Sequence, residues 1–151
     1  NQSVFKTAET LSDAERKQDR SAFWGSIHQT LVHILWGDEQ WMSRFADWPK
    51  PDMLNTPASL ADINDWSQLI SARQSADVKI EDWANSLTTD WLAADVMWYS
   101  GAAGRELSKP AWILVTHFFN HQTHHRGQVH AMLTGASAKT GDTDLFLMPG
   151  L

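Results

Sequence analysis

The segment from Ser108 to about Thr134 constrains the fold most, because its apolar residues repeat at the spacing of a helix with one buried face. The stripe consists of Leu114, Phe118, His121, His125, Val129 and Met132. His121 and His125 are four residues apart, so their side chains leave the same helical face one turn apart. Buried imidazoles need partners, and one divalent metal ion would satisfy both.

Three further segments show helical spacing, and together the four predict an all-α, four-helix bundle. We expect these helices at residues 3–11, about 23–45 and about 60–87, the last opened by Pro57-Ala58-Ser59. Residues 12–21 read as a polar connector, and residues 95–108 predict a short hairpin before the last helix. We treat residues 1–151 as a single domain. Because the chain opens on Asn1 and not on methionine, we expect its first helix to be incomplete.

Composition excludes several functions. The formal charge of −6 argues against nucleic acid as a partner, since phosphate binding needs clustered Lys and Arg. The absence of cysteine removes disulfides, cysteine nucleophiles and thiolate ligands. No apolar run of membrane-spanning length and no signal peptide are visible, so we expect a cytoplasmic protein without a membrane partner. The nine tryptophans suggest a pocket or a homodimer contact. We assign three of them to core or pocket wall, namely Trp36, Trp41 and Trp112.

The spacing of the histidines leaves several arrangements open. His117 lies four residues before His121 and could replace His125 as its partner, whereas His124 is expected to face outward. The pair could also be core histidines that hydrogen-bond to carboxylates or carbonyls. A tight metal site needs a third ligand from another segment, and spacing favours His33 over His28 only slightly.

The chain resembles the DinB/YfiT-like family of metal-binding helical bundles over nearly its whole length. The matching blocks are residues 23–35 (FWGSIHQTLVHIL), then Asp38, Trp41, Arg44 and Phe45, residues 117–129 (HFFNHQTHHRGQV) and residues 141–145 (GDTDL). The resemblance implies a three-histidine site for one divalent ion, zinc or nickel, with His33, His121 and His125 as ligands and water on the open side.

The resemblance also bears on function, because the wider superfamily includes enzymes that use a metal to activate a small thiol such as mycothiol, bacillithiol or glutathione. We therefore expect a metal-dependent enzyme of the small-thiol-dependent S-transferase or hydrolase type, with an unidentified small-molecule substrate. The absence of cysteine is consistent with a thiol cofactor. The alternative is a non-catalytic metal-binding stress-response protein, which would lack a general acid or base beside the metal.

Four other residues allow two readings each. Asp38 could orient a ligand histidine or pair with an arginine. Arg126 could bind an anionic substrate group, although a salt bridge is the favoured reading. Gly127, inside the last helix, could serve catalysis, although close approach of another helix is the favoured reading. Tyr99 could reach the mouth of the site or serve in packing.

Overall fold

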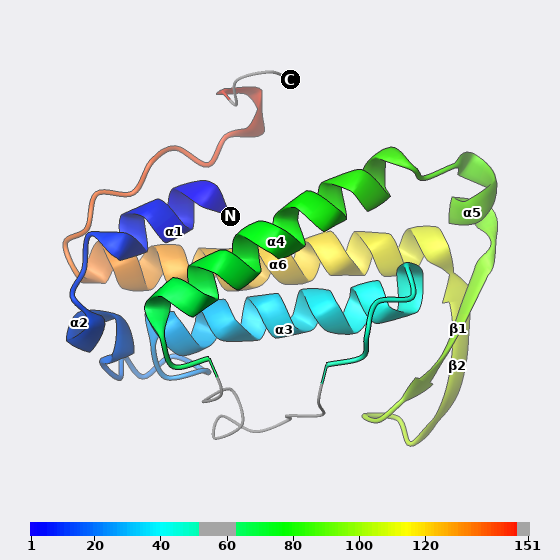
Figure 1. The fold of residues 1–151 in the computed structure, drawn as a ribbon, viewed down its shortest axis with the longest axis horizontal. Helices are drawn as coiled ribbons and strands as arrows, with labels where there is room; N and C mark the ends of the chain where they lie inside the picture. The colour runs from blue at the N-terminus through cyan, green and yellow to red at the C-terminus, as the bar shows by residue number, and fades with distance from the viewer. Residues whose placement is uncertain (52–62, 148–151) are drawn as a thin grey trace.

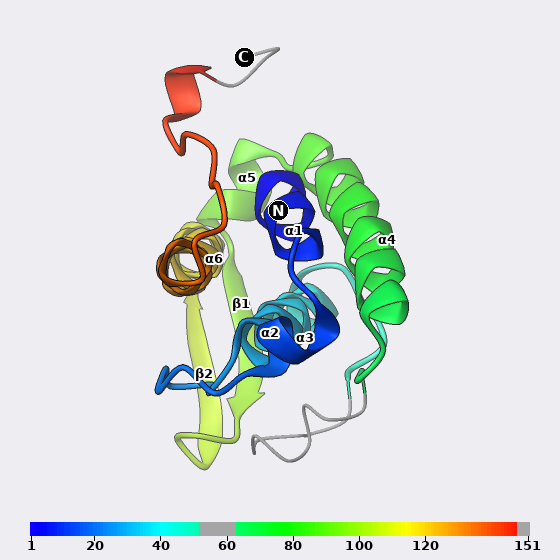
Figure 2. The same ribbon diagram turned by 90° about the vertical axis from the view of Figure 1, so that its left-hand side faces the viewer.

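Four helices form the body of the protein, whose computed structural model describes residues 1–51 and 63–147. They are α1 (Gln2–Glu9), α3 (Ile27–Phe45), α4 (Trp66–Asn85) and α6 (Ala111–Gly135). Viewed end-on, they surround a common interior, with α1 above α3 and between α4 and α6 (Figure 2). The predicted four-helix bundle is confirmed.

The remaining elements are short and lie mostly at the two ends of the bundle (Figure 1). They are α2 (Asp13–Lys17), α5 (Thr89–Ala93), β1 (Asp95–Ser100), β2 (Arg105–Pro110) and a 3₁₀-helix, η2 (Leu145–Leu147). The two strands pair antiparallel, from Asp95 opposite Pro110 to Ser100 opposite Arg105. The predicted hairpin before the last helix is therefore confirmed.

Two helices begin later than their apolar periodicity suggests, because capping residues fix their starts. The Ser26 side chain accepts a hydrogen bond from the Gln29 amide, so α3 begins at Ile27 and not near residue 23. Likewise, Asp65 caps α4, which begins at Trp66 and not near residue 60. The predicted opening at residues 57–59 lies outside the described residues.

The structure corrects the expected roles of two serines, Ser12 and Ser108. The connector at residues 12–21 contains α2, which starts with a reciprocal capping box between Ser12 and Glu15. Ser-x-x-Glu is the sequence signature of such a start. Ser108, where we expected the last helix to begin, instead lies in β2 and donates a hydrogen bond to Asp95, 3.1 Å away. Helix α6 begins after Pro110, with no side-chain cap.

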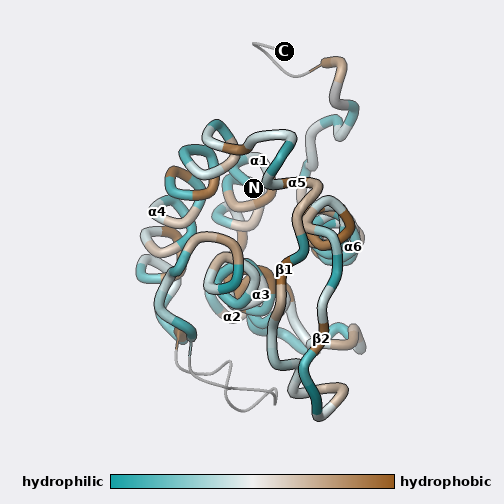
Figure 3. Tube along the Cα trace, turned by 90° about the vertical axis from the view of Figure 1, so that its right-hand side faces the viewer, coloured by the Kyte–Doolittle hydropathy of each residue, from teal (hydrophilic) through white to brown (hydrophobic). Residues whose placement is uncertain are grey.

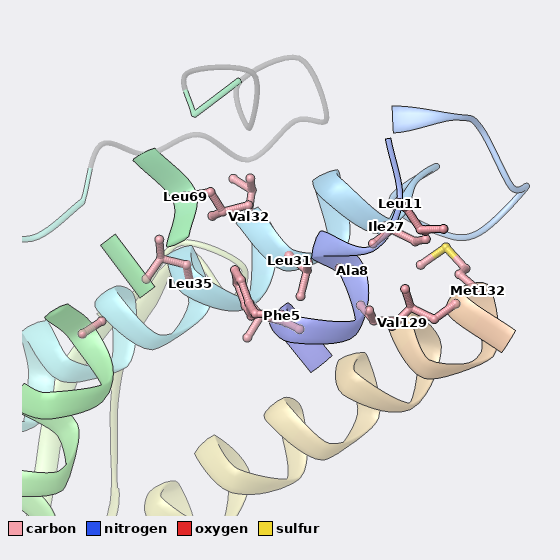
Figure 4. Packing of buried hydrophobic residues seen from close by; sticks show 13 residues of the cluster. Phe5, Ala8, Leu11, Ile27, Leu31, Val32, Leu35, Leu69, Val129 and Met132 are labelled. Atoms are coloured by element: carbon pink, nitrogen blue, oxygen red, sulfur yellow. The ribbon is translucent and has the colours of Figure 1, made fainter. Parts of the chain in front are cut away.

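The main core forms where α1, α3, α4 and α6 face one another. Figure 4 shows side chains from all four helices meeting there. Its most completely buried members are Ala8, Ile27, Leu31, Ile34, Leu35, Leu69, Val129 and Leu133. A second cluster lies toward the hairpin end, where Phe45 stacks on Trp83 with ring centroids 5.4 Å apart. Burial of these apolar groups is the main stabilising contribution.

Most exposed residues of α4 are polar, whereas α6 also exposes Trp112, Ile113 and Phe119. Along α4, hydrophobic and hydrophilic residues alternate within each turn (Figure 3), as expected of a helix with one buried face. None of the helices within residues 1–51 and 63–147 has the combination of length and apolar character that crossing a bilayer requires.

A buried ion pair ties α3 to α4. Arg73 lies 2.5 Å from Asp38, and both side chains are almost fully buried. Gln122 of α6 donates a second hydrogen bond to the same carboxylate oxygen, so one carboxylate connects three helices. Arg73 also pairs with Asp77, at 2.9 Å. Removing one partner of such a pair leaves an uncompensated buried charge, which is costly.

We therefore predict that Asp38→Ala lowers the free energy of unfolding by about 3–5 kcal/mol. Urea denaturation of the metal-free protein measures this loss. The matched control is Asp13→Ala, which removes an exposed ion pair with Lys17 of 2.7 Å. Water and salt screen exposed pairs, so this variant should lose much less stability. Equal losses in the two variants would contradict a structural role for the buried pair.

Candidate metal centre

Three imidazoles from two helices converge inside the bundle. His33 of α3 faces His121 and His125 of α6, and its Nε2 atom lies 3.2 Å from the Nε2 atom of each. One potential ligand nitrogen from each ring lies within 4.8 Å of the other two. His33 and His125 are 6% and 8% exposed, while His121 is half-buried. The three residues that the resemblance selected are thus brought together.

The distances match what a small divalent ion requires. Two imidazole nitrogens bound tetrahedrally at about 2.0–2.1 Å from one zinc ion lie about 3.3 Å apart. A hydrogen bond is a poorer account, because a single proton on the His33 Nε2 atom cannot point at two acceptors at once. The arrangement could hold one metal ion and would leave further coordination positions for other groups.

The electrostatics keep these imidazoles neutral, as metal ligation requires. Burial, followed by the neighbouring imidazoles, lowers the pKa of His33 to about 3 and that of His121 to about 4. Burial also lowers the pKa of His125, although its hydrogen bond to Gln128 opposes the shift. At neutral pH each ring therefore has one nitrogen without a proton.

The hydrogen bond to Gln128 sets which ring nitrogen of His125 is unprotonated. The His125 Nδ1 atom donates a hydrogen bond to the Gln128 Oε1 atom, 2.8 Å away, so the proton is on Nδ1. The Nε2 atom, which faces the other two histidines, keeps its lone pair. The Gln128 amide in turn donates to His124, at 3.2 Å. No role was expected for Gln128, although its position three residues after His125 indicates that the two side chains can meet.

Aromatic side chains fix the third ring. The indole of Trp24 stacks on His33 with centroids 3.9 Å apart, and Trp36 stacks on the same ring at 5.7 Å. The His33 Nδ1 atom is buried and has no hydrogen-bond partner among the described residues. Packing, and not hydrogen bonding, therefore orients this ring. Trp24 precedes α3, so the helical phase expected from about residue 23 could not predict this contact.

Gly37 makes the site geometrically possible. A Cβ atom at this position would lie 2.8 Å from the Cε1 atom of His121, closer than side chains pack. The glycine therefore lets the His121 ring lie against the backbone of α3. Close approach was predicted for Gly127, and this was wrong, because a Cβ atom there would have no described atom within 4 Å.

The other histidines lie outside the triad. His28 is buried, but its Nε2 atom lies 2.7 Å from the backbone oxygen of Ile63, away from the site. His117 is exposed and packs edge-on against Trp41, with centroids 5.1 Å apart. His124 is exposed, as predicted.

Several expected roles are not found. Asp38 pairs with Arg73, so it does not orient a ligand histidine. Arg126 has no carboxylate within ion-pair distance in the described part of the chain, and its favoured salt bridge is absent there. Tyr99 is 63% exposed and Trp112 is 55% exposed, so neither is a core residue.

Comparison with known proteins gives a match to a family model. The sequence model of the DinB family matches residues 1–149, nearly the entire chain. No curated protein and no solved structure matches the chain.

We predict that Gly37→Ala displaces the His121 ring and weakens metal binding by about 10–100-fold, as changes just outside a ligand shell do. Titration of the metal-free protein with zinc measures this affinity. The matched control is Gly127→Ala, the same change in an open helical position. It should stabilise the helix by up to about 1 kcal/mol and leave the affinity unchanged. Unaltered zinc affinity in Gly37→Ala would show that the close contact has no role.

Proposed function

The chain belongs to the DinB family, and from this premise we propose that His33, His121 and His125 bind one divalent metal ion, zinc or nickel. The observation that carries the proposal is the convergence of three Nε2 atoms from two helices. Imidazole ligands suit both metals, and the chain offers no thiolate competitor. The depressed pKa values of His33 and His121 support binding, because protons then compete weakly for the ligand nitrogens.

We further propose that the protein is a metal-dependent enzyme of the small-thiol-dependent S-transferase or hydrolase type. A metal held by three histidines would act as a Lewis acid and lower the pKa of a thiol or water bound beside them. Since the chain has no cysteine, a thiol nucleophile would come from a cofactor. Only two residues of the triad are buried, and the partial exposure of His121 supports access from that side.

The surrounding residues would have distinct tasks in such an enzyme. Gln128 holds the proton of His125 on Nδ1 and so keeps its Nε2 atom available. Trp24 and Trp36 orient His33 and exclude water from its faces. His117 and His124 are exposed imidazoles next to the triad, and each is in ring contact with one of its members.

One observation favours the alternative, a metal-binding protein without catalysis. No hydrogen bond or ion pair joins a triad histidine to a carboxylate or a lysine of the described residues. A general acid or base would then have to be an exposed histidine or part of the substrate. This alternative makes the same prediction for metal binding and the opposite one for turnover.

Metal content tests the ligand set directly. We predict that His33→Ala, His121→Ala and His125→Ala each lose bound metal, because two imidazoles form a much weaker site than three. The control is His130→Ala, on the same helix but outside the triad. Elemental analysis of the purified proteins after zinc loading provides the measurement. Equal metal content in all four variants would exclude these ligands.

Activity tests the catalytic proposal. We expect the zinc- or nickel-loaded protein to consume an electrophile from a test panel only when a small thiol such as mycothiol, bacillithiol or glutathione is present, or to hydrolyse a panel member. Spectrophotometric loss of substrate measures the rate, and metal-loaded His130→Ala should match the wild type. Turnover that persists in metal-free His33→Ala would refute a metal-dependent reaction. If the metal-loaded wild-type protein turns over no substrate with any thiol, this result favours the non-catalytic metal-binding protein.

A further inference from the structure

Arg44 lies on the same side of α3 as the candidate metal centre. His33, Gly37 and Arg44 recur at helical spacing, so they share one stripe of the helix. Gly37 lies at the level of His121, because the His121 ring packs against the backbone of Gly37. The seven residues from Gly37 to Arg44 correspond to about 10 Å along the helix axis. The backbone of Arg44 is therefore about two turns along α3 from the level of His121.

The guanidinium is held by aromatic rings and not by an acid. Its Cζ atom lies over the ring of Trp41, 4.4 Å from the centroid, and 6.0 Å from that of Trp98. The side chain is half-buried, and burial lowers the pKa of Arg44. No carboxylate in residues 1–51 and 63–147 lies within ion-pair distance of it. A guanidinium that lies over a ring keeps N–H donors at its edge for a planar acceptor.

A row of rings connects Arg44 to the histidines. Trp41, which contacts Arg44, lies 5.1 Å from His117, and His117 lies 6.1 Å from His121, measured between ring centroids. His117 is exposed and Trp41 is half-buried, so this row is open to solvent. Such a surface offers flat contacts for an apolar stem between two polar ends.

We propose that Arg44 binds the carboxylate of an elongated small molecule whose other end reaches the three-histidine centre. A carboxylate matches the planar fork of the guanidinium and can accept two parallel hydrogen bonds. The inference rests on the proposed metal site for the position of the second end. It assigns a substrate class, namely compounds whose metal-binding group and carboxylate are joined by a stem long enough to cross Trp41 and His117.

Arg126, which the sequence offered for an anionic substrate group, is the competing arginine and provides the comparison. It is also a half-buried arginine near the site, with no described ion-pair partner. It lies five positions after His121, so its side chain leaves α6 about 140° away from the His121 direction. Replacing it removes the same net charge without touching the row of rings.

The test uses linear dicarboxylic acid monohydroxamates of increasing chain length, each compared with its methyl ester. Hydroxamate binds divalent metals independently of thiol chemistry, so a failure of the thiol reaction does not affect the result. Calorimetric titration of the zinc-loaded protein should show an acid that binds about tenfold more tightly than its ester, as expected for one charge-assisted hydrogen-bonding group. Arg44→Gln should abolish this preference, and Arg126→Gln should retain it.

Equal affinities of acid and ester at every length, or a preference that persists in Arg44→Gln, would overturn the proposal. A direct measurement covers the case in which hydroxamates do not bind or Arg44→Gln misfolds. In that case the Nε–H resonance of Arg44 in nitrogen-15-labelled wild-type protein is followed during titration with octanoate. A saturable shift of this resonance supports a carboxylate site, and its absence overturns one. If the wild-type protein does not bind zinc, this result refutes the metal proposal, and the octanoate titration still tests Arg44.

Discussion

The structure depends on how closely α3 and α6 approach each other at Gly37. A methyl group at that position would collide with the His121 ring. With hydrogen alone, the ring lies against the helix backbone and its Nε2 atom lies 3.2 Å from that of His33. Interhelical distance is set by the side chains at the contact. One small residue therefore decides whether histidines from two helices can share an ion.

Polar and aromatic contacts hold that approach in place. Asp38, next to Gly37, pairs with Arg73 of α4 and accepts from Gln122, next to His121. Asp38 on α3 and Gln122 on α6 are thus each one residue from the contact between Gly37 and His121. Buried ion pairs contribute little net stability against an apolar replacement, but they penalise arrangements that separate the partners. We infer that this network fixes the register of α3 against α6 more than it stabilises the fold.

The sequence allowed the fold to be predicted more fully than the site. Helical periodicity placed His121 and His125 on one face, and the break in period before Pro110 indicated the hairpin. The helix starts were predicted less accurately. Apolar periodicity suggested earlier starts, whereas side-chain hydrogen bonds from Ser26 and Asp65 cap α3 and α4. Periodicity also could not locate contacts between helices, which is why close approach was assigned to Gly127.

By itself, the sequence determined which histidines share a helical face, since that follows from 3.6 residues per turn. Spacing left the third histidine open between His28 and His33, and the family resemblance selected His33. Only the tertiary structure decided the partners: His33 against the α6 pair, Asp38 with Arg73, and Arg44 beside two indoles. The physical reason is that periodicity specifies direction around one helix axis. The distance and register between two axes arise from packing of side chains that are remote in sequence.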